Sequence, residues 1–381
     1  MFKKTLVVSS LILASGFASA DFRYQTPLGM DTPVIASENQ PELSNASQVS
    51  CGYNFCLAIK NGTVWAVGEN GDFQLGLGIS SNGVDQLAWT DTGFTATAVA
   101  AGDEFSWAIH DGTIWSVGKA EYGEMGLGIV SDSRQEWTNT GQAADFISVD
   151  HNHGYAISGG RVYSVGGGAS GKLGLGSTSS YSTFQDTGFN ADQVDAGRNH
   201  GIAIQNGTVY VVGDGGNGQL GDGSRTDRSV WTASSIGNAT DVSAGYQNSF
   251  AVSNGEVLVT GYSSYGQLGM GNSTQQNNWT SNGQTGVTDV ESSRNSAYII
   301  KEGVIWSSGR GAYGRLALGT TTSHTTFQDT GFAADAIHAS DHGVRAVKNG
   351  EIYSAGRNNS GQLSLNNKVD VSVFTLSVDS P

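Results

Sequence analysis

The sequence predicts an all-β protein, a seven-bladed β-propeller built from four-stranded blades. A short hairpin recurs seven times along the 381 residues, and the glycines that close it are spaced 50, 48, 47, 48, 48 and 47 residues apart. Each period has room for four short strands, and no segment has helical periodicity. A unit of this length must stack on its neighbours to bury a core. The closing glycines are Gly68, Gly118, Gly166, Gly213, Gly261, Gly309 and Gly356.

Each repeat has the same parts in the same order. A strand of small residues such as Val99–Gly102 is followed by an apolar strand such as Trp107–Ile109. An Asn-Gly or Asp-Gly pair then turns the chain, because these residues accept the positive φ angles of a two-residue hairpin. After the closing glycine come a loop that ends in a Gln-Leu-Gly-like triplet, as at 74–76, and an aromatic-led strand, as at Trp137.

The two ends of the repeat array are unequal. An aromatic-led strand is missing upstream of Val49, whereas the last repeat retains one from Val373 to Val378. An open solenoid would leave apolar faces uncovered at both ends, but a ring closed by pairing of the N- and C-terminal segments would not. We therefore expect a closed propeller over residues 46–381, with residues 21–45 either adding a strand to it or wrapping outside it.

Residues 1–20 have the pattern of a secretory signal peptide. Lys3 and Lys4 precede an apolar stretch from Leu6 to Leu13, and a small-residue cleavage pattern ends at Ala20. We expect export from a bacterial cell to the periplasm or the exterior. No later stretch approaches about 18 consecutive apolar residues, so no membrane anchor is expected.

The charge balance disfavours one class of partner. The chain has 19 basic and 34 acidic residues and a net charge of −15 at pH 7. Nucleic-acid binding relies on neutralisation of phosphates by basic side chains, so this sign disfavours it. We expect a monomer without a cofactor.

The repeat resembles that of the regulator of chromosome condensation family over roughly residues 46–378. The resemblance rests on the small-residue strand, the Ala-Gly turn, the Asp/Asn-Gly pair, the Val-Trp/Tyr-x-x-Gly strand and the Gly-Gln-Leu-Gly loop. It implies a seven-bladed propeller that binds partners through loops on one face. Members of this family include an exchange factor for a GTPase, ubiquitin-ligase modules, a plant ultraviolet receptor and secreted bacterial inhibitors of β-lactamases. Regular repeat lengths leave no room for the wedge that the exchange factor uses.

The two cysteines predict a disulfide. Cys51 and Cys56 flank a four-residue turn, and the corresponding columns of other repeats hold small residues such as Ala101 and Ser106. Two small positions that face each other across a hairpin, both cysteine in an exported chain, favour a bond between them. A Cys/His metal site is the alternative, but it lacks the usual paired spacing.

The turns after the small-residue strands vary most between repeats, and four of the chain's seven histidines lie there. Successive hairpins reverse direction, so the glycine loops, including Tyr265, Arg310, Tyr313 and Arg357, should share that face. We predict a partner-binding face formed by Tyr53, Phe55, Glu104, Phe105, His151, His153, Arg198, His200, Tyr246, Arg294 and His342. The alternatives are solvated turn residues without a role, and a metal site formed by His151, His153 and His200.

Enzymatic motifs are not evident. The segment Gly166–Lys172 matches G-x-x-x-x-G-K, but Leu173 follows the lysine where a phosphate-binding loop needs Ser or Thr and a helix. The sequence contains no G-x-S-x-G or H-E-x-x-H motif. We therefore predict a non-catalytic binding scaffold for a protein partner. The alternatives are an inhibitor of a secreted or periplasmic enzyme, and a carbohydrate binder or enzyme that uses the channel mouth.

Overall fold

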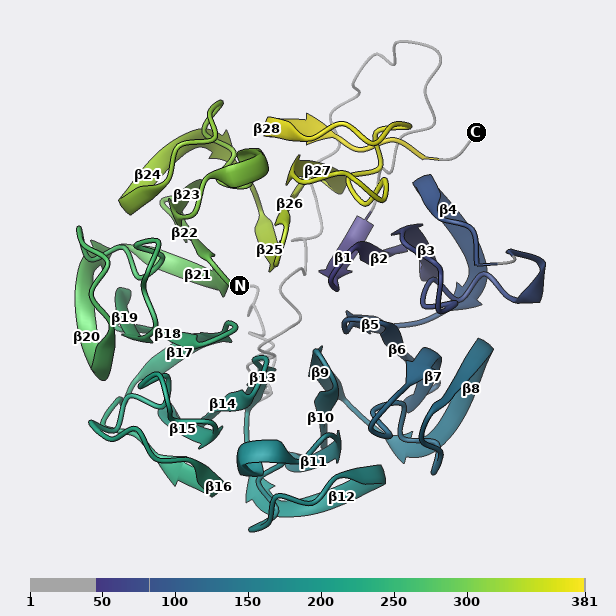
Figure 1. Ribbon diagram of the computed structural model, residues 1–381, viewed down its shortest axis with the longest axis horizontal. Coiled ribbons are helices and arrows are strands. Elements are labelled where there is room, and N and C mark those ends of the chain that lie inside the picture. Colours follow the sequence, from purple (N-terminus) through teal and green to yellow (C-terminus); the bar gives the residue numbers. More distant parts are fainter. Residues whose placement is uncertain (1–45, 82, 380–381) are drawn as a thin grey trace, which may run out of the picture.

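The computed structural model describes residues 46–81 and 83–379, which form a ring of seven four-stranded antiparallel sheets (Figure 1). The seven-bladed propeller predicted from the sequence is confirmed. The predicted signal peptide (1–20) and the segment 21–45 lie outside the described residues. Within the described ranges, no helix is long and apolar enough to cross a membrane.

Each blade consists of four consecutive strands, with the first next to the central axis and the fourth at the rim (Figure 1). The strands are, for blade 1, β1 (Ala46–Cys51), β2 (Phe55–Lys60), β3 (Thr63–Gly68) and β4 (Gln86–Thr95); for blade 2, β5 (Ala98–Ala101), β6 (Phe105–His110), β7 (Thr113–Ala120) and β8 (Asp132–Ala143); for blade 3, β9 (Phe146–Asp150), β10 (His153–Ser158), β11 (Arg161–Gly166) and β12 (Tyr181–Asn190); for blade 4, β13 (Gln193–Ala196), β14 (His200–Gln205), β15 (Thr208–Gly213) and β16 (Arg228–Ala233); for blade 5, β17 (Ala239–Ala244), β18 (Asn248–Ser253), β19 (Glu256–Gly261) and β20 (Gln276–Thr285); for blade 6, β21 (Val287–Ser292), β22 (Ser296–Lys301), β23 (Val304–Gly309) and β24 (His324–Ala333); and for blade 7, β25 (Ala336–Ser340), β26 (Gly343–Lys348), β27 (Glu351–Gly356) and β28 (Val371–Leu376). Three short 3-10 helices lie in loops: η1 (Ile79–Ser81), η2 (Ala169–Gly171) and η3 (Ala312–Gly314).

The hairpin turns between the second and third strands have the predicted geometry. Asn61 and Gly62 have φ angles of 50° and 80°, and the other six pairs are positive at both positions. This is the type I′ pattern, whose twist matches that of the flanking strands. The Asn-Gly and Asp-Gly pairs therefore fix the register of the hairpins.

Neighbouring blades are joined by an aromatic ring that lies on a glycine. The aromatic side chain lies on the fourth strand of one blade, and the glycine ends the Gln-Leu-Gly-like loop of the preceding blade. A Cβ added to Gly174 would lie 2.6 Å from Nε1 of Trp231, and Gly76 meets Trp137 in the same way. We call this contact the aromatic–glycine latch. Because the ring covers the glycine, only a residue without a side chain fits this position at these seams.

The seam between blades 7 and 1 closes the ring. Ser364 occupies the glycine position of the latch, and its hydroxyl accepts a hydrogen bond from the backbone N–H of Trp89 at 2.8 Å. Trp89 also forms an isolated parallel bridge with Asp379, whose carboxylate pairs with Lys60 at 2.6 Å. The two ends of the array therefore meet, as expected for a closed ring. The aromatic-led strand of each repeat is the outermost strand of that repeat's own blade. The ring therefore closes without a strand from one end of the array entering the blade at the other end.

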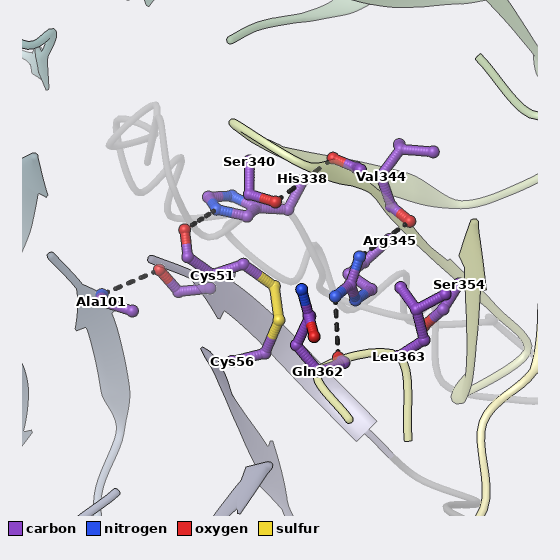
Figure 2. The surroundings of a disulfide bond; sticks show 12 residues. Cys51, Cys56, Ala101, His338, Ser340, Val344, Arg345, Ser354, Gln362 and Leu363 are labelled. Atoms are coloured by element: carbon purple, nitrogen blue, oxygen red, sulfur yellow. Dashed lines mark hydrogen bonds between the residues drawn. A yellow bond between two sulfur atoms is a disulfide. The ribbon is translucent and has the colours of Figure 1, made fainter. Parts of the chain in front are cut away.

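The predicted disulfide is confirmed at this seam. Cys51 and Cys56 occupy opposite positions on β1 and β2 and are bonded to each other (Figure 2). The bond is buried in the cluster that joins blade 1 to Val347 and Ile352 of blade 7. It therefore lies in the interface that closes the ring.

A buried arginine also lies at the closing seam. Arg345 occupies the third position of β26, where the other blades have large core residues such as Trp107, Tyr155 and Tyr298. Its guanidinium donates to the carbonyl of Gln362 at 2.8 Å (Figure 2). In blade 6, the Tyr298 hydroxyl donates to the corresponding carbonyl, that of Arg315, at 2.7 Å. Burial lowers the pKa of Arg345 to about 9. No carboxylate among the described residues forms an ion pair with it.

The latch predicts a steric penalty for a methyl group. Gly174→Ala should lower the free energy of unfolding of the propeller by about 1–3 kcal/mol, because the new Cβ overlaps the Trp231 side chain. Gly141→Ala is the matched control, since Gly141 has a similar φ of +78° but nothing within 4 Å of an added Cβ. Chemical denaturation of both variants tests this. Equal losses of stability would mean that backbone strain, and not the ring contact, is responsible.

The unpaired cation at the closing seam predicts a stabilising change. Arg345→Tyr should keep the hydrogen bond to Gln362 and remove the buried charge, which raises the free energy of unfolding by about 1–4 kcal/mol. The reciprocal change Tyr298→Arg should lower it. Thermal unfolding of both variants measures the effect, and a loss of stability in Arg345→Tyr would contradict it.

Candidate functional site

The turns between first and second strands and the loops between third and fourth strands lie at the same end of the ring. In every blade, the residue after the closing glycine donates its backbone N–H to the carbonyl of the last turn residue. The pairs are Glu69 to Asn54, Lys119 to Glu104, Gly167 to Asn152, Asp214 to Asn199, Tyr262 to Gln247, Arg310 to Asn295, and Arg357 to His342, at 2.8–3.0 Å. We call this end the turn face. The expectation that both sets of residues share one face is confirmed.

Four of the predicted contact residues are not on this surface. Phe55, Phe105, His153 and His200 are each 0–1 % exposed. They are the first residues of β2, β6, β10 and β14, and each lies opposite the closing glycine of its own hairpin. Because the turn is shorter than expected and the strand begins earlier, these side chains pack between blades. They therefore do not reach a partner, and the predicted face must be corrected at these positions.

Six of the other seven predicted residues form two groups of side-chain contacts on the turn face. The Tyr53 and His342 rings lie 4.7 Å apart, and the Arg198 and Arg294 guanidiniums lie 4.4 and 4.5 Å from the Tyr246 ring centre. Arg198 and His151 both approach Asp103, at 3.8 and 2.5 Å. The seventh residue, Glu104, pairs with Lys119 at 2.6 Å instead.

A pocket of about 420 Å³ lies on the turn face over blades 5–7. We call it the Arg–Tyr pocket, and its lining includes Tyr246, Tyr262, Tyr265, Arg294, Arg310, Tyr313, Arg315, Asp341, His342 and Arg357. Only Tyr246, Arg294 and His342 of these belong to the contact face predicted from the sequence. Arg315 was missed as a site residue, although it departs from the glutamine found at this loop position in most repeats.

Cations stack on tyrosines throughout the Arg–Tyr pocket. The Arg310 guanidinium lies 5.1 Å from the Tyr265 ring centre, and the Arg357 guanidinium lies 5.1 Å from that of Tyr313. Both tyrosines are 39 % exposed. Guanidinium groups stacked on aromatic faces keep their N–H edges available for a ligand.

His342 is neutral at physiological pH. Burial, followed by the charges of Arg315 and Arg357, lowers its pKa to about 4. The positive charge of the pocket therefore comes from the arginines alone. Arg315 is itself buried, and it donates to the Asp341 carbonyl at 2.7 Å.

The part of the turn face over blades 1 and 2 is acidic. It carries Glu69, Asp72, Glu104 and Glu121, with Lys119 as their basic neighbour. Partial burial, followed by the Glu104 charge, raises the pKa of Asp72. The turn face is therefore dipolar, with acidic groups over blades 1 and 2 and arginines over blades 5–7.

The buried histidines do not form the metal site left open by the sequence. No group of three or more His, Cys, Asp or Glu side chains within residues 46–81 and 83–379 is placed to hold a metal ion. Burial lowers the pKa of His153 well below its usual value and that of His200 to about 4. His200 Nε2 lies 2.8 Å from the Ser249 hydroxyl. Both rings act as neutral packing groups.

Comparison with known proteins supports the repeat assignment. Residues 206–252 match the sequence profile of the regulator of chromosome condensation (RCC1) repeat. No curated protein sequence matches the chain. This match confirms the predicted RCC1-like repeat within residues 206–252.

Three solved structures have the same fold at a TM-score of 0.73. Human WBSCR16 is 19 % identical, with 84 % of this chain and 94 % of that chain covered. Yeast RCC1 (Prp20) in complex with Kap60 is 15 % identical, with 92 % and 91 % covered. Prp20p from Saccharomyces cerevisiae is 16 % identical, with 88 % and 87 % covered. At these identities the likeness shows the fold alone.

The two buried histidines predict acid sensitivity. A histidine whose pKa is lower in the folded than in the unfolded chain contributes stability above about pH 6.5, which is lost as the pH falls toward 4. Asparagine occupies the same strand position in blade 5, as Asn248. The double variant His153→Asn with His200→Asn should therefore reduce the loss of unfolding free energy on acidification by about 1 kcal/mol per pH unit for each histidine. Urea denaturation between pH 7 and 4 measures the slope. An unchanged slope in the variant would exclude these groups as its origin.

Proposed function

We propose that this RCC1-type propeller is an exported, non-catalytic scaffold that binds a protein partner through its turn face. The observation that carries the proposal is the dipolar turn face, where arginine and tyrosine side chains gather on loops held by a rigid ring. Arg and Tyr are enriched at the centres of protein interfaces. Loops on a rigid scaffold are also where binding residues concentrate.

Structural relatives support a protein as the partner. Yeast RCC1 was solved in complex with Kap60, and Prp20p has binding properties toward Gsp1p and histones. These partners belong to those proteins and not to this chain. The shared architecture supports the same general use of the fold, with a partner set by the variable loops.

Export is proposed from the leader sequence in residues 1–20. The buried disulfide fits this proposal, because such bonds persist in oxidising compartments outside the cytoplasm. Inhibition of a secreted or periplasmic enzyme is one form that such binding would take.

Partner capture tests the proposed function. The chain from Asp21 onward, immobilised, should retain a protein from the secreted or periplasmic fraction of its source cells. Tyr53→Ala, Tyr246→Ala and Arg294→Ala together should reduce capture at least about tenfold, since central Tyr and Arg contacts each contribute 2 kcal/mol or more. The control combines Asp111→Asn with Glu302→Asn, two exposed hairpin residues at the opposite end of the ring.

Two outcomes would contradict the scaffold proposal. One is equal capture by the triple variant and the unmodified chain, which would move the site off the turn face. The other is binding only to members of a glycan array with no protein retained, which would favour a carbohydrate binder.

A further inference from the structure

We infer that the Arg–Tyr pocket binds an acidic segment of the partner protein, one that presents several Asp or Glu carboxylates. This inference rests on the proposed function and names the chemistry that the partner must present. It depends on the charge, the stacking and the surroundings of the pocket.

The pocket holds positive charge that the described part of the chain does not neutralise. Arg294, Arg310 and Arg357 form no ion pair with any carboxylate in the described ranges. Three arginines elsewhere on the surface do have acidic partners: Arg134 with Asp132, Arg161 with Asp186 and Arg228 with Asp222, each at 2.6 Å. In a chain with a net charge of −15, three unpaired arginines at one pocket form a site for an external anion.

Stacking prepares these arginines for carboxylates. Arg310 lies on Tyr265, Arg357 on Tyr313, and Arg294 on Tyr246. A guanidinium held against an aromatic ring loses less freedom on binding, and its planar N–H edge matches the two oxygens of a carboxylate. Because the tyrosine rings already contact guanidiniums, they are less available for stacking on a sugar.

The lining of the pocket has more basic than acidic groups. Asp341 is its one acidic residue, against Arg294, Arg310, Arg315 and Arg357. The Asp341 carboxylate accepts the backbone N–H of Arg294 at 3.2 Å, and burial, followed by the Asp103 charge, raises its pKa. His342 adds no charge, so the four arginines set the sign of the pocket.

The dipolar turn face favours a protein segment over a uniform polyanion. Blades 1 and 2, with Glu69, Asp72, Glu104 and Glu121, lie across the ring from blades 5 and 6 (Figure 1). A polymer that is negative along its whole length would be repelled where it crosses blades 1 and 2. A protein can place acidic side chains over the pocket and neutral or basic ones over the acidic half, and this fixes its orientation.

Fluorescence anisotropy with a labelled peptide of alternating Glu and Gly tests the inference. The full propeller chain should bind it at least about tenfold more tightly than the matching Gln and Gly peptide, and added salt should weaken binding. Arg310→Gln with Arg357→Gln should weaken binding at least about tenfold. The control, Arg161→Gln with Lys301→Gln, removes the same charge next to hairpin turns at the opposite end and should bind as the unmodified chain does.

Four outcomes would overturn the inference. They are equal binding of the two peptides, equal loss in the pocket and control variants, preference for polygalacturonate or inorganic phosphate over the acidic peptide, and self-association in sedimentation experiments that the pocket variant abolishes. If partner capture still depends on Tyr53, Tyr246 and Arg294 while the acidic peptide fails to bind, the scaffold function stands and this inference alone falls.

Discussion

The contact of an aromatic side chain with a glycine of the preceding blade is the constraint on which the closed propeller depends. Aromatic side chains bury about 150–250 Å² each, so one such contact per seam gives a large apolar area to an interface made of small sheets. The aromatic side chain fits at the seam only if the facing residue is very small, as at Gly76 and Gly174. The same requirement explains why this loop position holds glycine in five of the seven repeats and the small residues Ala317 and Ser364 in the other two. At the closing seam, Ser364 replaces the glycine and bonds the Trp89 backbone.

Because the latch and the type I′ hairpins fix the framework, the turns and loops at one end are free to vary. The variation is not random in charge. Acidic groups gather over blades 1 and 2, and arginines stacked on tyrosines gather over blades 5–7. A rigid frame holds these groups at fixed distances, so binding does not require the frame to rearrange. A surface with opposite charges at its two sides also selects the orientation of whatever binds it.

The sequence was sufficient for the framework, because the framework depends on local rules repeated seven times. Positive φ at Asn61 and Gly62 and the pairing of Cys51 with Cys56 follow from residue type and spacing. The candidate site was predicted less well. His153 and His200 were expected on the surface, but a shift of one residue at the start of a strand turns the side chain into the seam. One signal could have shown this burial: both histidines stand opposite the recurring closing glycine of their own hairpin. The stacking of Arg357 on Tyr313 joins loops of two blades, and only the ring geometry brings them together.

Every blade is built from four strands that follow one another in the chain, and within residues 46–81 and 83–379 no sheet takes a strand from a distant segment. A cut between any two blades would therefore leave all seven sheets whole. A circular permutant, in which the original termini are joined and new termini are opened at another blade boundary, would keep every pair of hydrogen-bonded strands. Only the seam that holds the chain ends would change. By the same logic, duplication or deletion of one repeat in the gene adds or removes a complete sheet. The architecture thus allows the circumference of the ring to evolve in whole blades.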